Sequence, residues 1–547
     1  MSNSLLRRKT VSAADAEGKN TGMRRVLSVK DLTFFGIAAI IGGGTFSAIG
    51  NACYSGGPGV ILLYAICAVA CGFTAMCYAE FASRVPVSGS AYTYAYITFG
   101  ELFAWIIGWA LIMEYSIGNI YIAFSWSGYF TNIVQGIPEW LTINYKSAHQ
   151  AFVSGTPGEG LTAWLSAPQI GGLRIIFDMP ALAINVFLTA LVFVGTSESR
   201  NLSNTMVIIK LSIIVLVIIV GAFHVDIENW TPFMPNGFNG VMAGVSAVFF
   251  AYIGFDAVST LAEESKNPQR DLPRSMIYSL IICTVVYMVL ALVITGMAPY
   301  KLLGVSDPLA EIFKINGVKW MLFIVSLAAV IAMTSVLLVY QMGQPRIWMS
   351  MSRDGLLPKK FSSIHPKFKT PGFATIVTGL VVGIPIFFTD EKIVLDFTSI
   401  GTLFAFALVC GGILILPRNT DLKEKGRFRM PYVNAKYIVP AVTAVSLTVI
   451  AVFYPNSIYS DDANTRLNYP MIIFYIVWAV IAILSYVRNF SLIPVIGLLA
   501  CCYLLTGMGW TNWAMFGAWL VIGLTIYFLY GHRNSKLAGI TERKVSE

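Results

Sequence analysis

The sequence predicts an all-α polytopic membrane protein built around two sets of helices, each opening with a broken helix. Three observations predict this class. The 547 residues are 56% hydrophobic and 12% charged, with a mean hydropathy of +0.71, whereas a soluble chain carries about twice that share of charge. Apolar stretches of about 20 residues, the length that crosses a bilayer, recur almost from end to end. Helix-breaking sequences interrupt the first and the sixth of these stretches.

The apolar stretches predict about 14 transmembrane helices. Their approximate ranges are 34–56, 58–82, 101–134, 179–196, 205–224, 240–262, 275–298, 318–345, 373–389, 395–416, 437–454, 470–487, 490–508 and 513–531. We expect the first ten to form a transporter core at residues 32–416, with inverted repeats at about 32–224 and 240–416.

The rest of the chain is expected to be peripheral. A basic cytoplasmic loop at 417–436 leads to four further helices at 437–531, and polar tails occupy 1–31 and 532–547. The aromatic, polar stretch from Pro86 to Tyr96 is too polar to span and predicts an interfacial helix at the inner surface.

The net charge of +9 gives an orientation for these helices. With the N-terminus inside, about 29 of the 37 Lys and Arg residues lie on the cytoplasmic side and about 7 outside, as the positive-inside rule requires. Both termini are therefore expected in the cytoplasm. Membrane orientation therefore explains the excess of basic residues without nucleic-acid binding, and the lipid bilayer is the expected surrounding.

Enzyme signatures are absent from the sequence. There is no phosphate loop, nucleophile elbow or paired-histidine metal site. The eight cysteines lie in or beside apolar stretches without metal-ligand spacing. We expect no enzymatic activity, cofactor or metal, and no partner subunit is indicated. A bacterial inner membrane is the expected location, although one of the three Asn-X-Ser/Thr sites, Asn229-Trp230-Thr231, faces outward under this topology.

The first broken helix contains Gly42, Gly43 and Gly44, and a second break runs from Ala251 to Asp256 in the sixth stretch. Close helix packing alone explains many membrane glycines. Two breaks five segments apart instead favour a central binding site, because unwound backbone at membrane depth persists only where it lines a cavity. Freed amides suit a carboxylate and freed carbonyls suit an ammonium group, so the pair predicts a zwitterionic amino acid substrate.

Three of the charged residues within the apolar stretches are candidates for a function. Lys210 either extends to the interface or carries protons, and an ionisable residue inside a span favours function. Glu114, in the third stretch, is expected to be its counter-charge or relay partner, or else a structural pair. Asp256 ends the second break and either gates the inner path or caps the half-helix.

The sequence resembles the cationic amino acid transporter branch of the amino acid–polyamine–organocation superfamily, of bacterial type. The resemblance runs from about Val26 to Pro417. It rests on these matching segments: Gly36–Phe46, Cys77–Phe81, Val85–Tyr92, Gly100–Leu102, Ile107–Trp109, Glu114–Tyr115, Glu198–Ser199, Met206–Lys210, Gly254–Asp256, Glu263–Pro273, Gly343–Arg346, Ser352–Pro358 and, near the C-terminus, Trp519–Gly531.

The resemblance implies a core of five plus five helices like that of the leucine transporter. It implies that the substrate carboxylate meets amides around Gly42, Gly43 and Gly44. The amine would meet carbonyls near Ile40 and near Phe250, Ala251 and Ile253. Phe250 would close over the substrate from outside, Met333 would line the side-chain pocket, and Lys210 would occupy the place of a sodium ion.

The sequence departs from this family pattern in the first break. Gly43 stands where relatives often carry a hydroxyl or methyl side chain, and Thr45 replaces a customary Ile.

These residues predict a secondary active amino acid importer that works by alternating access with proton symport. An electroneutral exchanger and an amino acid sensor without net flux remain as alternatives. A channel fits less well, because a substrate cradle at two helix breaks suits stoichiometric binding.

Overall fold

The protein is described by a computed structural model that covers residues 4–10, 25–134, 136–155, 158–171, 173–305, 307–389, 391–416, 428–453 and 468–538. Within these residues, eight helical segments are long and apolar enough to cross a membrane, and four apolar helices are shorter. Helix is present in each of the 14 predicted apolar stretches. Most of the expected loop at 417–436 and most of both expected tails lie outside the described residues.

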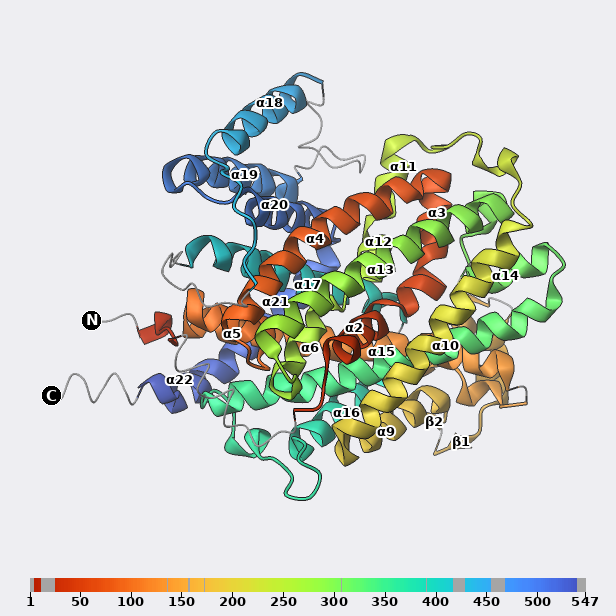
Figure 1. The fold of residues 1–547 in the computed structure, drawn as a ribbon. Helices are drawn as coiled ribbons and strands as arrows, with labels where there is room; N and C mark the ends of the chain where they lie inside the picture. Colours follow the sequence, from red (N-terminus) through yellow and green to blue (C-terminus); the bar gives the residue numbers. More distant parts are fainter. Residues whose placement is uncertain are drawn as a thin grey trace.

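The N-terminal part consists of long helices joined by short connections (Figure 1). Its helices are α2 (Val29–Ile40), α3 (Ile49–Gly56), α4 (Val60–Arg84), α5 (Ser90–Thr98), α6 (Glu101–Ile133), α9 (Met179–Val194), α10 (Thr196–Ala222), α11 (Gly237–Ala243), α12 (Val245–Tyr252), α13 (Pro268–Met297), α14 (Pro308–Ile315), α15 (Lys319–Arg353), α16 (Gly372–Ile386) and α17 (Glu391–Ile415). A π-helical turn, η2 (Gly44–Ala48), joins α2 to α3, and a 3₁₀ helix, η6 (Phe255–Glu264), follows α12.

Local sequence signals explain where several helices begin. Ser28 and Asp31 form a capping box at the start of α2, in which each side chain bonds the backbone amide of the other residue. Asp178 caps α9 and is followed by Pro180, and α13 begins at Pro268. These signals end the connecting loops and start each helix at a defined residue.

The centre of the bundle is formed by α6, which packs against α15 and α17, and by α13, which packs against α2 and α4. The two broken helices, α2–η2–α3 and α12–η6, run between these long helices. This arrangement places both breaks in the buried interior, with Ile40, Ile41 and Tyr252 all buried.

The C-terminal part adds α18 (Ile438–Phe453), α19 (Tyr469–Arg488), α20 (Leu492–Thr506), α21 (Trp510–Ile526) and α22 (His532–Asn534). In Figure 1, α18 and α19 lie outermost, with α20 beneath them. α20 packs on α17 and α4, and α21 packs on α17 and α6. The α6–α21 contact stacks Trp109 on Trp519, with ring centroids 4.7 Å apart.

The segment between α6 and α9 folds on itself. It contains a 3₁₀ turn, η4 (Glu139–Leu141), α7 (Tyr145–Ser154), α8 (Glu159–Ser166) and the paired two-residue strands β1 (Gln169–Ile170) and β2 (Leu173–Arg174). Ala148, Ala163 and Trp164 form a small separate core. The connection between α6 and α9 is therefore a small folded unit.

The predicted interfacial helix is buried by other parts of the chain. The stretch does form a helix, α5, but every one of its residues is buried. The N-terminal residues cover it: the Lys9 amide donates to Tyr96 O, and the Lys9 ammonium pairs with Asp354 at 2.6 Å. Polar and aromatic composition predicted an interface because the sequence alone did not show that the chain's own N-terminal residues would cover the helix.

Candidate functional site

The two helix breaks touch each other at the centre of the bundle. A Cβ built on Gly44 would lie 2.4 Å from Ala251 Cα, and one built on Gly254 would lie 2.7 Å from Ala39 Cβ. Gly254 also has φ of +121°, a conformation that favours glycine. Small residues at both breaks thus let the two backbones approach closely, which larger side chains would prevent.

The first break leaves buried amides without a backbone partner. Within the described residues, no backbone hydrogen bond is donated by the amides of Gly42 or Gly43, although Gly42 O accepts from Thr45 N at 3.0 Å and Phe46 N at 3.2 Å. Both glycines are buried. Buried amides are nearly always bonded, so two adjacent unbonded amides mark a site that can bind an anionic group.

Lys210 lies in α10 and is fully buried, so it does not extend to the membrane interface. Its ammonium donates to the carbonyls of Ile37, Ala38 and Ile41, at 3.2, 3.1 and 2.7 Å, and to Ser335 Oγ in α15 at 2.8 Å. The end of α2 next to the break thus supplies three carbonyl oxygens to one cation. Carbonyl and hydroxyl oxygens are also the ligands that hard metal cations prefer.

Tyr287, in α13, connects the two breaks. Its hydroxyl lies 2.8 Å from Ile40 O and 2.9 Å from Ala251 O, and it accepts from Thr45 Oγ1 at 3.1 Å. These are two of the carbonyls predicted to meet a substrate amine, and the predicted extra hydroxyl of Thr45 also points here. A carbonyl has two lone pairs, so each can still accept a second donor.

Sequence reasoning missed both Tyr287 and Ser335. A tyrosine inside an apolar span needs a partner for its hydroxyl, and this was the signal for Tyr287. A single serine such as Ser335 gives no comparable signal, because small residues are common at membrane helix interfaces.

Aromatic side chains enclose the space beside Gly43. Phe250 is buried and packs edge-on against Tyr121, with ring centroids 5.3 Å apart. A Cβ on Gly43 would meet Tyr121 Cε1 at 3.3 Å and Phe250 Cε1 at 3.8 Å. Ile253 and Met333 are buried as well, with Met333 two residues before Ser335 on α15. The structure thus brings Gly43 and Phe250 together.

Glu114 and Asp256 are buried, but neither contacts Lys210. In the described structure, Glu114 Oε2 and both carboxylate oxygens of Asp256 lack a hydrogen-bond partner. The two carboxyl groups are close enough to interact electrostatically. The predicted pairing of Glu114 with Lys210 is therefore absent from this conformation, and Glu114 is near Asp256 instead.

Ion pairs join the second half of the sixth helix to the C-terminal part of α15. Glu264, at the end of η6, forms a buried ion pair with Arg346 of α15, and Glu263 pairs with Arg353 at 2.9 Å. The amides of Val26 and Leu27 both donate to Glu264 O, at 2.9 and 3.0 Å. The second half of the sixth helix is thereby tied to α15 and to the segment before α2.

Comparison with known proteins identifies the family of this chain. The family model for amino acid permeases matches residues 27–481. The chain belongs to the amino acid permease family. A model for the C-terminus of such permeases matches residues 491–535, so family similarity extends into the peripheral helices.

Three relatives span nearly the whole permease. The branched-chain amino acid permease BcaP of Bacillus subtilis is 35% identical over 98% of this chain and 100% of the relative. The methylthioribose transporter of the same organism is 34% identical, covering 98% and 99%. The vacuolar cationic amino acid transporter 2 of Arabidopsis thaliana is 32% identical, covering 98% and 93%. All three are transporters rather than enzymes, and this permease is an integral membrane protein of the same superfamily.

Proposed function

We propose that this permease is a secondary active transporter that imports amino acids together with protons, by alternating access of a central site in a leucine-transporter-like core. The observation that carries the proposal is the pair of buried, unbonded amides of Gly42 and Gly43 at the junction of two broken helices. Such amides suit a carboxylate. The adjoining carbonyls of Ile40, Phe250, Ala251 and Ile253 suit an ammonium group.

The proposed site has a separate region for the substrate side chain. Phe250 and Tyr121 form its wall next to Gly43, and Met333 is the proposed contact from α15. The relatives are named for branched-chain amino acids, methylthioribose and cationic amino acids. The aromatic and apolar lining favours an apolar side chain, and competition for uptake among the twenty amino acids tests this.

Lys210 is the proposed coupling residue. Protonated, its ammonium holds three carbonyls of α2 against Ser335 of α15. Loss of the proton removes these charge-assisted hydrogen bonds, each worth about 1.5–3 kcal/mol, and frees α2 from α15. A proton moving inward through 100 mV supplies about 2.3 kcal/mol, enough for roughly fifty-fold accumulation.

Further elements of the proposal concern orientation and gating. Both termini are proposed to lie in the cytoplasm of a bacterial cell, so the ion pairs of Glu263 and Glu264 close the inner path. Asp256 lies between the break and those ion pairs. We propose that it helps to gate the inner path, with Glu114 as its neighbour.

Uptake into proteoliposomes tests the proposal. With an imposed inward pH gradient, the wild type is expected to accumulate substrate. Lys210→Ala is expected to lose gradient-driven accumulation while still exchanging substrate across the membrane. Equal wild-type rates with and without the gradient would contradict coupling. Dependence of all uptake on internal substrate would favour an exchanger, and saturable binding without flux would favour a sensor.

A further inference from the structure

A second site lies away from the substrate region, at the end of the bundle that holds the termini. It is a cavity of about 500 Å³ between the core and the C-terminal helices, lined by residues of α4, α17, α19, the start of α20 and the segment at Met430. Arg84, Ile415 and Arg488 are the last residues of three helices that end there. Because α4 and α19 are each long enough to span a bilayer, their ends place the cavity at headgroup depth.

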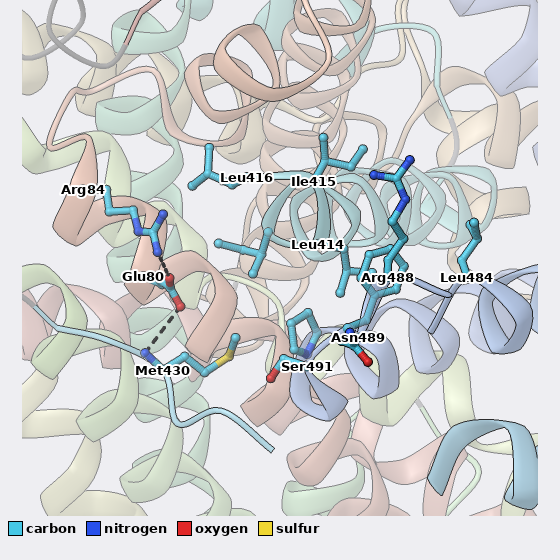
Figure 2. A pocket seen from close by; sticks show the side chains of 13 residues that line it. Glu80, Arg84, Leu414, Ile415, Leu416, Met430, Leu484, Arg488, Asn489 and Ser491 are labelled. Carbon is cyan, nitrogen blue, oxygen red and sulfur yellow. Dashed lines mark hydrogen bonds and ion pairs between the residues drawn. The ribbon is translucent and has the colours of Figure 1, made fainter. Parts of the chain in front are cut away.

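The charged groups of this cavity are arranged on two sides. Figure 2 shows Glu80 bonded to Arg84 and to the Met430 amide on one side, and Arg488 on the other. Two arginines and one glutamate give the lining a formal charge of +1. The carboxylate of Glu80 is already bonded, whereas the guanidinium of Arg488 makes no hydrogen bond or ion pair with any residue that the structure describes.

The arginines alone do not make a site, because basic residues in the last turn of a helix also interact favourably with its C-terminal carbonyls. Ser491 provides the independent observation. It is 4% exposed and lines the cavity, yet its hydroxyl lacks a hydrogen-bond partner in the described structure. Ser491 also occupies the N-cap position of α20, where a serine normally bonds the first turn, and forms no such bond.

Apart from Asn489, the remaining lining is apolar, and part of it is exposed at the surface. Leu414, Ile415, Leu416 and Leu484 line the cavity, and Ile415 and Leu484 are 49% and 41% exposed. A ligand held here thus has a charged and hydroxyl-bearing end against an apolar wall open to the membrane. An acyl chain fits that wall, a phosphate fits the guanidinium of Arg488, and the Ser491 hydroxyl is a further polar group for the headgroup.

We infer that this cavity binds an anionic phospholipid, whose phosphodiester contacts Arg488 and whose headgroup extends toward the Ser491 hydroxyl, while an acyl chain lies along Leu414–Leu416 and Leu484. The single negative charge of the phosphodiester balances the charge of +1, whereas a zwitterionic headgroup adds no net charge and leaves the lining at +1. Basic pockets between transmembrane helices bind anionic headgroups in the same way. A bound lipid would join the core helices α4 and α17 to the peripheral helices α19 and α20.

Native mass spectrometry of the full-length protein in detergent tests the inference, with phosphatidylglycerol and phosphatidylcholine of matched acyl chains as probes. The wild type is expected to bind phosphatidylglycerol more tightly. Arg488→Gln is expected to weaken this binding by about fivefold, since one arginine near an anionic headgroup contributes about 1 kcal/mol. Ser491→Ala is expected to weaken it by a smaller factor and Arg488→Lys to preserve most of it.

The matched control is Arg270→Gln, which removes an exposed arginine in the first turn of α13, outside the cavity. Its binding of phosphatidylglycerol should equal that of the wild type. Equal binding by wild type and Arg488→Gln would overturn the inference, as would equal binding of the two lipids by the wild type. If inorganic phosphate at millimolar concentration displaces the lipid, the cavity is a site for free anions and the lipid assignment is wrong.

Discussion

Replacing Gly44 by alanine tests whether contact between the two helix breaks forms the substrate site. The added Cβ would lie 2.4 Å from Ala251 Cα and 3.0 Å from Ala251 N. These are backbone atoms, so no side chain can rotate away. Ordinary van der Waals contact begins at 3.4 Å. Lengthening the distance between the added Cβ and Ala251 Cα to that value requires the half-helices to separate by about 1 Å at this point.

The size of the effect follows from this displacement. Overpacking a well-packed interior costs about 1–3 kcal/mol. The same movement lengthens the distance between Ile40 O and Ala251 O, which now both lie within 2.9 Å of the Tyr287 hydroxyl. One of those hydrogen bonds must then break. We expect substrate affinity to fall by about ten- to a hundredfold, at about 1.4 kcal/mol for each factor of ten.

Gly43→Ala is the matched control, one residue away. Its Cβ would meet the edge of the Tyr121 ring at 3.3 Å, and an aromatic side chain can move by the few tenths of an ångström required. We expect uptake of radiolabelled amino acids by proteoliposomes to fall less than about threefold in this variant, since volume changes that the surroundings absorb cost little. Wild-type uptake by Gly44→Ala, or equal losses in both variants, would refute the reasoning.

Three further predictions concern other parts of the structure. Tyr287→Phe keeps the ring but removes the hydroxyl between the breaks, so uptake should fall about tenfold with little change in melting temperature; unchanged uptake would count against its role. Glu264→Gln should lower the unfolding free energy by about 3–5 kcal/mol, because Arg346 is left buried without its ion-pair partner, and thermal unfolding that matches the wild type would contradict this. Burial opposes ionisation of Asp31, but hydrogen bonds from Ser28 and Asn204 and the charge of Arg200 hold its pKa below the ordinary value of 3.8. Asp31 should therefore stabilise the fold above pH 3.8 and lose this contribution as pH falls through its lowered pKa; a stability difference from Asp31→Asn that persists unchanged at lower pH would disprove it.

The helices were predictable because the bilayer sets their length. A run of about 20 apolar residues has few alternatives to a helix in lipid, and the glycines at 42–44 located the first break within it. Burial of α5 was not predictable in the same way. Its three tyrosines suit an interface equally well, and the contacts of Lys9 with Tyr96 O and with Asp354 show that the N-terminal residues cover it.

Within the candidate site, the sequence indicated that Lys210 is buried but did not indicate its partners. Lys210 was predicted as a buried functional lysine, and the structure buries it. Its expected partner was Glu114, because carboxylates are the usual counter-charges in membranes. In the structure, carbonyls at the end of α2 contact Lys210 instead. Backbone acceptors freed by a helix break cannot be recognised from the side chains of the sequence.

The carbonyl contacts of Lys210 also bear on whether coupling needs a side chain at position 43. In the proposed mechanism the carbonyls of Ile37, Ala38 and Ile41 hold Lys210, while the amides of Gly42 and Gly43 hold the substrate carboxylate. The lysine ammonium and the substrate carboxylate then both bind one short backbone segment, residues 37–43. Binding at the amides shifts the carbonyls that the ammonium uses, so proton and substrate are linked through the main chain, and a hydroxyl at position 43 is not required. Gly43→Ser should accordingly leave the stoichiometry of proton to substrate unchanged, which parallel measurements of proton and substrate flux in proteoliposomes would check; an altered ratio would assign the coupling to a side chain at that position.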